Sequence, residues 1–140
     1  MSRKIFFLLI VTFILSIASA CNKENPVEPG SELIGQWELS YIHLIMGQDK
    51  LSYTPQQANL MIRFSVKNDK TFSLIIINPP GTTNDSGSWS ISSNHLLVKY
   101  TDGRNMDLIY EVVDNKLVLK GDYEFSPGMK TPAELMFLKN

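Results

Sequence analysis

The sequence predicts an all-β fold, an up-and-down antiparallel barrel of about eight strands that follows an N-terminal export signal. From Leu33 onward, apolar and polar residues alternate with a period of two in short runs rich in β-branched and aromatic side chains. Clusters of Gly, Asn, Asp and Pro separate these runs, and no stretch of ten or more residues has convincing helical periodicity. Eight strands is about the number at which a closed barrel is just filled by side chains or holds one small ligand.

The chain begins with the three-part layout of a secretory signal, over residues 1–20. Two basic residues, Arg3 and Lys4, precede an apolar run over residues 5–17, and small residues follow up to Ala20. The apolar run is shorter than the roughly 20 residues that a membrane-spanning helix needs. We therefore expect this segment to be removed as a signal peptide.

The only cysteine, Cys21, directly follows three small residues, 18–20, and excludes an intramolecular disulfide. This arrangement resembles the bacterial lipobox, with Ala18 in the place where leucine is most often found. The resemblance implies that Cys21 carries a diacylglycerol and an acylated amino terminus, which together anchor the protein stably to a membrane. An ordinary signal with an incidental cysteine, or an uncleaved anchor, is the alternative.

Residues 21–31 are predicted to be a lipidated tether. After the cysteine they contain two prolines, one glycine and a single aliphatic side chain, too little to bury for folding. The pair Lys23-Glu24 loosely resembles signals that send lipoproteins to the outer cell surface, and a plain solvated linker is the alternative. We expect a cell-envelope protein, lipid-anchored to the outer membrane or cell surface in preference to the inner membrane.

The remaining residues, 32–140, are expected to form one domain. Removal of the signal leaves a chain long enough to bury a continuous core without disulfides or metals. The alternating runs predict strands over residues 33–45, 59–67, 71–78, 88–92, 95–101, 106–113, 116–125 and 132–139.

Alternation also assigns a face to each side chain. In the second predicted strand, Leu60, Ile62, Phe64 and Val66 share one side, which is expected to face the interior. By the same argument the further inward residues are Trp37, Leu39, Tyr41, Phe72, Leu74, Ile76, Trp89, Ile91, Leu96, Val98, Tyr100, Leu108, Tyr110, Val112, Leu117, Leu119, Leu135 and Phe137.

The connections between predicted strands alternate between long and short. Successive connections of an up-and-down barrel lie at opposite ends, so one end should be open and the other closed. The long connections are 46–58, 79–87, 102–105 and 126–131, and the short ones are Asn68-Asp69, Ser93-Asn94 and Asp114-Asn115, which have the residues of tight hairpin turns.

The segment Leu33-Ile34-Gly35-Gln36-Trp37 resembles the Gly-x-Trp signature of lipocalins. Further motifs follow in order, namely Asn68-Asp69-Lys70-Thr71-Phe72, Gly87-Ser88-Trp89-Ser90-Ile91 and Lys116-Leu117-Val118-Leu119. Together they resemble the lipocalin-like family of bacterial lipoproteins across residues 33–139.

This resemblance implies structural roles for Gly35 and Trp37 at the closed end, where the indole plugs the barrel under a basic side chain of the last strand. Lys139 stands where an arginine is usual and cannot stack on the indole as a guanidinium does. The first connection, 46–58, is implied to be a flap over the mouth, with Thr54-Pro55 opening one helical turn.

Charge and composition argue against several function classes. The 13 basic side chains do not outnumber the 14 acidic ones, so the charge balance does not suggest a nucleic-acid partner and we expect none. With two histidines and one cysteine, a conventional zinc site is not expected, and no calcium loop, phosphate-binding loop or nucleophile elbow is present in the sequence. We expect no enzymatic activity, no cofactor and no metal.

If the barrel has a cavity, alternation and loop placement predict which residues surround its mouth. The candidate ligand-binding residues are Tyr41, His43, Leu60, Ile76, Tyr100 and Leu135. The imidazole of His43 could orient a ligand, and so could the hydroxyls of the inward tyrosines Tyr41, Tyr100, Tyr110 and Tyr123. A solvent-exposed histidine at a strand end, and core tyrosines with satisfied hydroxyls, are the alternative interpretations.

Two function hypotheses follow. The first is a membrane-anchored binding module that holds a small hydrophobic or amphipathic molecule. The second is a barrel filled by its own bulky side chains, which binds another envelope or cell-surface protein through its open-end loops. In either case the membrane is a partner through the N-terminal lipid, and we expect a monomer.

Overall fold

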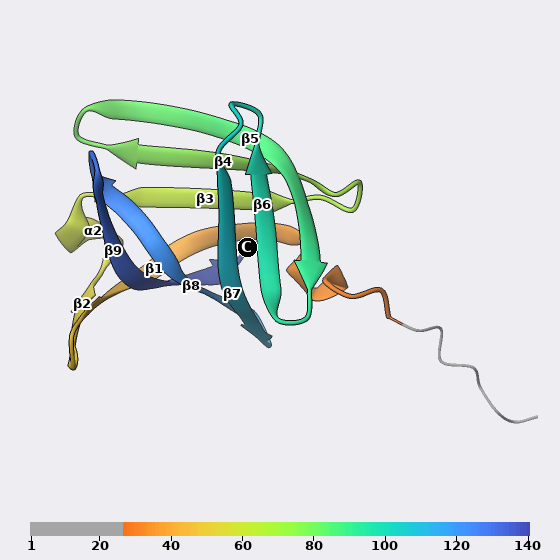
Figure 1. The fold of residues 1–140 in the computed structure, drawn as a ribbon, viewed down its shortest axis with the longest axis horizontal. Coiled ribbons are helices and arrows are strands. Elements are labelled where there is room, and N and C mark those ends of the chain that lie inside the picture. The colour runs from red at the N-terminus through yellow and green to blue at the C-terminus, as the bar shows by residue number, and fades with distance from the viewer. Residues whose placement is uncertain (1–26) are drawn as a thin grey trace, which may run out of the picture.

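A computed structural model describes residues 27–140 as an antiparallel β-barrel (Figure 1). The predicted signal peptide, Cys21 and the first part of the predicted tether lie outside the described residues. The elements are η1 (Ser31–Leu33), β1 (Gly35–Met46), β2 (Asp49–Tyr53), α2 (Pro55–Ala58), β3 (Met61–Val66), β4 (Thr71–Asn78), β5 (Gly81–Ser92), β6 (His95–Tyr100), β7 (Asn105–Val113), β8 (Lys116–Ser126) and β9 (Met129–Lys139).

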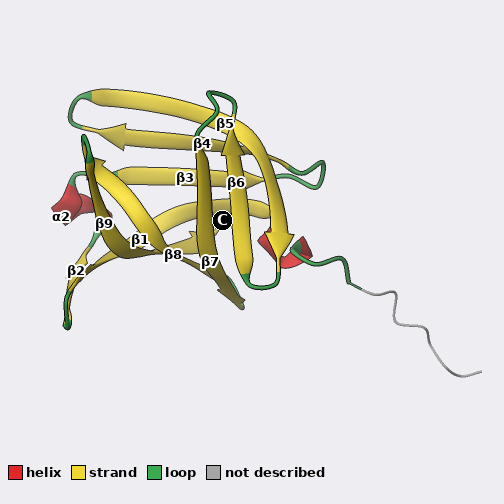
Figure 2. Ribbon diagram, viewed as in Figure 1, coloured by secondary structure: helices red, strands yellow, loops and turns green. Residues whose placement is uncertain are grey.

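Eight of the strands close into the barrel, as the sequence predicts. Each strand from β3 to β9 pairs with its neighbour in sequence, and β1 pairs with both β3 and β9. The short β2 is an addition that pairs only with the last part of β1, over Ile42–Met46. Strands make up most of the domain, and the two short helices lie at opposite ends of it (Figure 2). No helix within residues 27–140 is long and apolar enough to span a membrane.

The closed end is built around Trp37, which is 1% exposed. Its indole Nε1–H donates to the carbonyl oxygen of Leu33 at 2.7 Å, which ties η1 across the end of the barrel. The Lys139 ammonium lies 5.0 Å from the centre of the indole, a cation–π distance, so the basic side chain expected on the last strand is present. Gly30, with φ of 87°, packs so closely on Trp89 and Ile91 that a Cβ atom would collide with them.

Two of the predicted long connections, 79–87 and 126–131, are shorter than expected. Residues 81–87 belong to β5, and only Pro79-Pro80 turn the chain between β4 and β5. Likewise β8 and β9 meet at Pro127-Gly128. The connection between β6 and β7, residues 101–104, has the predicted length of four residues. The first part of β5 lacks apolar alternation because its side chains have little core to bury, and the ladder with β4 from Asn78↔Gly81 to Thr71↔Ser88 holds it extended instead.

The first connection is long, and it is ordered. It contains β2 and α2, and α2 begins with Pro55 as its first residue, as Thr54-Pro55 predicts. The Thr54 hydroxyl accepts from the backbone N–H of Gln57, and the Gln57 side chain accepts from the backbone N–H of Thr54, which forms a complete capping box.

The predicted orientation is wrong at one place in β1. The pairing of β1 with β9 shifts register between Leu39 and Tyr41, which is a β-bulge. The bulge reverses the alternation, so Ile42 is 3% exposed while Tyr41 is 45% exposed. Apart from Tyr41 and His43, every residue predicted to point inward is in the core or packs against it.

Candidate ligand cavity

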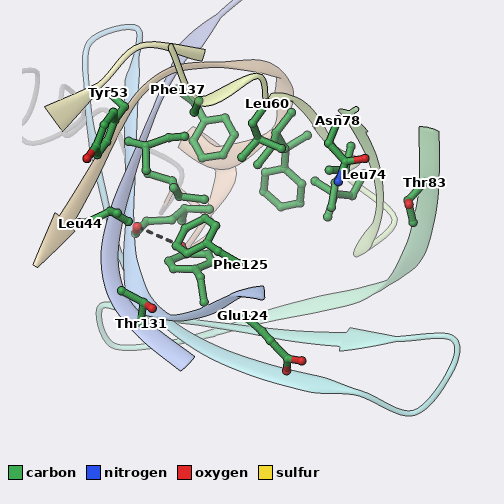
Figure 3. A pocket seen from close by; sticks show the side chains of 18 of the residues that line it. Leu44, Tyr53, Leu60, Leu74, Asn78, Thr83, Glu124, Phe125, Thr131 and Phe137 are labelled. Atoms are coloured by element: carbon green, nitrogen blue, oxygen red, sulfur yellow. Dashed lines mark hydrogen bonds between the residues drawn. The ribbon is translucent and has the colours of Figure 1, made fainter. Parts of the chain in front are cut away.

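A cavity of about 770 Å³ opens at the rim of the barrel opposite Trp37 (Figure 3). This volume lies within the range of pockets that hold small molecules in other proteins. Its wall is largely aliphatic and aromatic. The apolar lining comprises Ile42, Leu44, Leu60, Ile62, Phe64, Leu74, Ile76, Val98, Met106, Leu108, Leu119, Phe125, Leu135 and Phe137.

Large side chains fill the closed end of the barrel, while those toward the other end leave space between them. Trp37, Leu96 and Leu117 are among the largest fully buried side chains and fill the closed end. Toward the mouth, Thr83 on β5 and Thr131 on β9 line the wall. The barrel is therefore packed solid at its base and hollow near its rim.

The residues around α2 form part of the mouth. Tyr53 at the end of β2, and Gln57, Ala58 and Asn59 in or after α2, line the cavity. Asn59 has φ of 46°, in the left-handed region, and ends the helix so that the chain can enter β3. The capping box thus positions one edge of the opening.

Two tyrosines bring hydroxyl groups to the cavity wall. The Tyr123 hydroxyl donates to the Leu119 carbonyl oxygen at 3.0 Å, and burial raises the pKa of Tyr123 well above its usual range. The Tyr100 hydroxyl donates only to the thioether of Met106, at 3.4 Å, and sulfur is a weak acceptor. Burial also raises the pKa of Tyr100, so its hydroxyl stays protonated and can bond a better acceptor.

Polar side chains gather at the mouth, and among them only one is charged. Asn78, Thr83, Thr131 and Glu124 line the opening and surround the apolar side chains (Figure 3). The Glu124 carboxylate points away from the other side chains drawn and accepts a hydrogen bond from the backbone N–H of Gly128 at 2.7 Å. Within residues 27–140, no lysine, arginine or histidine lines the cavity.

A charged cluster ties the β6–β7 turn to β5. The Arg104 guanidinium contacts Asp102 at 2.6 Å and Asp85 at 3.1 Å, and it lies 4.6 Å from the centre of the Tyr100 ring. Hydrogen bonds from the backbone and side chain of Arg104 hold the pKa of Asp102 below its usual value. The cluster is a local brace, and its cation is paired with two carboxylates.

The structure brings together four of the six residues predicted to bind a ligand. Leu60, Ile76, Tyr100 and Leu135 all line the cavity. The other two, Tyr41 and His43, lie outside it because the bulge in β1 turns them to the outer face.

On that outer face, the rings of Tyr41 and His43 stack with 6.1 Å between their centres. His43 Nδ1 lies 2.7 Å from the Ser52 hydroxyl of β2. Partial burial, helped by the nearby charge of Lys50 and opposed by that of Glu134, lowers the pKa of His43. The pair therefore helps to attach β2 to β1.

Sequence reasoning missed several lining residues. Ile42 and Leu44 replace Tyr41 and His43, and no local signal distinguishes the two sets because apolar side chains occupy both parities of this strand. Phe125 has the same parity as Leu119 and Tyr123 in the predicted strand 116–125, so continued alternation is the signal that could have found it. The capping signal at Thr54 predicted the start of α2 correctly, but it did not predict that Gln57, Ala58 and Asn59 line the cavity.

Two solved structures with a similar fold come from species of Bacteroides. A crystal structure of a lipocalin-like protein from Bacteroides uniformis has a TM-score of 0.55 at 16% sequence identity, and the match covers 78% of this chain and 99% of that one. A crystal structure of an uncharacterized protein from Bacteroides eggerthii has a TM-score of 0.52 at 13% identity, covering 76% and 98%. At these identities the likeness concerns the fold alone.

No curated protein matches the chain. The family of the lipocalin-like domain matches residues 33–119, which is more than half of the sequence and includes Gly35 and Trp37. Taken with the closed eight-stranded barrel and its single plugged end, this match shows that the chain belongs to the lipocalin-like domain family.

Proposed function

We propose that this lipocalin-like barrel binds one small, largely apolar molecule in its cavity. The observation that carries the proposal is an open cavity of about 770 Å³ whose wall is mostly aliphatic and aromatic. Burial of apolar ligand surface in such a preformed site is favourable by about 25 cal/mol for each Å² removed from water. The lipocalin-like family is generally one of binding proteins, and we propose no reaction for this barrel.

The cavity also weighs against the second hypothesis, a barrel filled by its own side chains. The bulky residues Trp37, Phe64 and Phe137 do point inward, and they are buried. They are concentrated toward the closed end and in the cavity wall, and space remains beside them. The loops at the open end are mostly tight turns, which offer less surface to a protein partner than the long connections that the sequence predicted.

We further propose that the protein is a membrane-anchored envelope lipoprotein, attached through acyl chains on Cys21. The described chain enters the barrel beside its closed end, where Gly30 packs on Trp89. An anchor at Cys21 therefore joins the end opposite the mouth, which leaves the mouth free to face away from the anchoring membrane. If the proposal is correct, Cys21→Ser should move the protein from the membrane fraction of its host to the soluble envelope fraction. Unchanged membrane association would refute it.

Binding can be tested with the neutral fluorescent probe N-phenyl-1-naphthylamine and the Cys21→Ser protein. Ile76→Lys places an ammonium in the cavity wall and should weaken probe binding at least tenfold. Ile77→Lys is the matched control, because Ile77 is the next residue of β4 and is 39% exposed. Absence of probe binding by the parent protein, or equal loss in both variants, would contradict the proposal.

A further inference from the structure

The charges around the cavity suggest which chemical class of ligand it accepts. We infer that the cavity selects uncharged amphiphiles, such as long-chain alcohols and their carbonyl-bearing equivalents, over carboxylates with the same chain. This inference rests on the proposed binding function and specifies it. The juxtaposition that carries it lies within residues 27–140: an apolar interior with no lining cation, and a mouth whose polar groups are almost all neutral.

An anionic head group would find no partner inside the cavity. Within the described residues, the lining contains no lysine, arginine or histidine, and its interior polar groups are the hydroxyls of Tyr100 and Tyr123. An ionised carboxylate taken from water without an opposite charge loses much of its solvation energy. A neutral hydroxyl or carbonyl loses far less, and Tyr100 can donate to it because its present acceptor is only the Met106 sulfur.

An anionic head group at the mouth would also find no positively charged side chain among the lining residues of the range 27–140. The one charged lining residue is Glu124, and its charge is negative. The other polar side chains at the mouth are neutral, and they suit an alcohol or a carbonyl. They are Tyr53, Gln57, Asn59, Asn78, Thr83 and Thr131.

Two basic residues near this end of the barrel, Arg104 and Lys50, are paired with carboxylates. Arg104 is paired with Asp102 and Asp85. Lys50 is paired with Glu134 at 2.5 Å. Lys130 stands opposite Glu124 in the β8–β9 ladder and does not line the cavity. Among residues 27–140, the cavity lining therefore offers no positive charge to attract an anion.

The inference can be tested by displacing N-phenyl-1-naphthylamine with dodecan-1-ol and with dodecanoate, two compounds with the same chain length, at pH 8. The wild-type sequence carrying only Cys21→Ser should bind the alcohol at least tenfold more tightly. Asn78→Lys adds a cation at the mouth and should bring the two affinities within about threefold of each other. Asn78→Met, which matches lysine in length without its charge, should keep the preference for the alcohol.

The outcomes separate the two proposals. Equal affinity for both compounds, or tighter binding of dodecanoate by the parent protein, would overturn the inference and leave the binding function standing. A preference for the alcohol that survives equally in Asn78→Lys would also overturn it, since charge would then not be its cause. A parent protein that binds neither the probe nor either compound would overturn the binding function itself.

Discussion

Replacing Trp37 by Phe should destabilise the barrel more than the same replacement at Trp89. The two tryptophans form a natural comparison, since each is buried, each donates its indole N–H to a backbone carbonyl, and each lies beneath a lysine. They differ in the setting of that hydrogen bond. The bond from Trp37 to Leu33 is buried and 2.7 Å long, whereas the bond from Trp89 to Lys67 is partly buried and 3.1 Å long.

The size of the difference follows from what each carbonyl meets after the change. Leaving a buried acceptor unsatisfied costs about 1–3 kcal/mol, while an acceptor that water can reach loses only the net value of a hydrogen bond, about 0.5–1.5 kcal/mol. Phenylalanine keeps most of the apolar contact in both places and leaves a similar small void. We therefore expect Trp37→Phe to lower the free energy of unfolding by about 1 kcal/mol more than Trp89→Phe does.

Urea unfolding followed by far-ultraviolet circular dichroism measures both values on the Cys21→Ser background. With similar m-values, the midpoint of Trp37→Phe should lie below that of Trp89→Phe by several tenths of a molar. Equal midpoints, or a lower one for Trp89→Phe, would refute the idea that the buried bond to Leu33 secures the closed end.

Three further predictions follow from the described contacts. Gly87→Ala should lower the thermal midpoint measured by circular dichroism by several degrees, because its Cβ would overlap the backbone carbonyl oxygen of Lys99; an unchanged midpoint would show that β5 and β6 can separate without cost. The depressed pKa of Asp102 stabilises the fold at pH values above the unfolded pKa of this group, and this contribution is lost as the pH falls through the folded pKa. The difference in urea midpoint between wild type and Arg104→Gln should accordingly be larger at pH 7 than at pH 2.5. A difference independent of pH would contradict the idea that the Arg104–Asp102 pair stabilises the fold. Finally, Tyr41→Ser should leave the affinity for N-phenyl-1-naphthylamine within about twofold of the parent value, because the side chain lies on the outer face; a tenfold loss in the same fluorescence titration would place it in the cavity after all.

Much of the fold was predictable because its signals are local. Period-two alternation set the inward face of most strands, since neighbouring side chains of a strand must point to opposite sides of a sheet. The pairs Ser93-Asn94 and Asp114-Asn115 marked tight turns, and the structure has positive φ at Ser93 and Asp114. The position of Lys139 over Trp37 followed from the strand order that the family resemblance implied.

The length of the hairpins was less predictable. Residues 81–87 are polar and rich in glycine, serine and threonine, which are the residues of a loop as well as of a solvated strand. Their extension depends on hydrogen bonds to β4, whose residues 71–78 form a strongly apolar partner. Because these hydrogen bonds join backbone atoms, they impose no alternation on the side chains of residues 81–87.

The sequence by itself determined an eight-stranded barrel, its plugged end and the helical turn at Thr54, because each depends on residues that are neighbours in the chain or in one strand. Only the tertiary structure decided that Ile42 and Leu44 face the interior while Tyr41 and His43 do not, since the bulge is a property of the β1–β9 pairing and joins residues more than 90 positions apart. The cavity was likewise decided in three dimensions. Whether inward side chains fill a barrel depends on their summed volume at each level, and this sum requires the register of all eight strands.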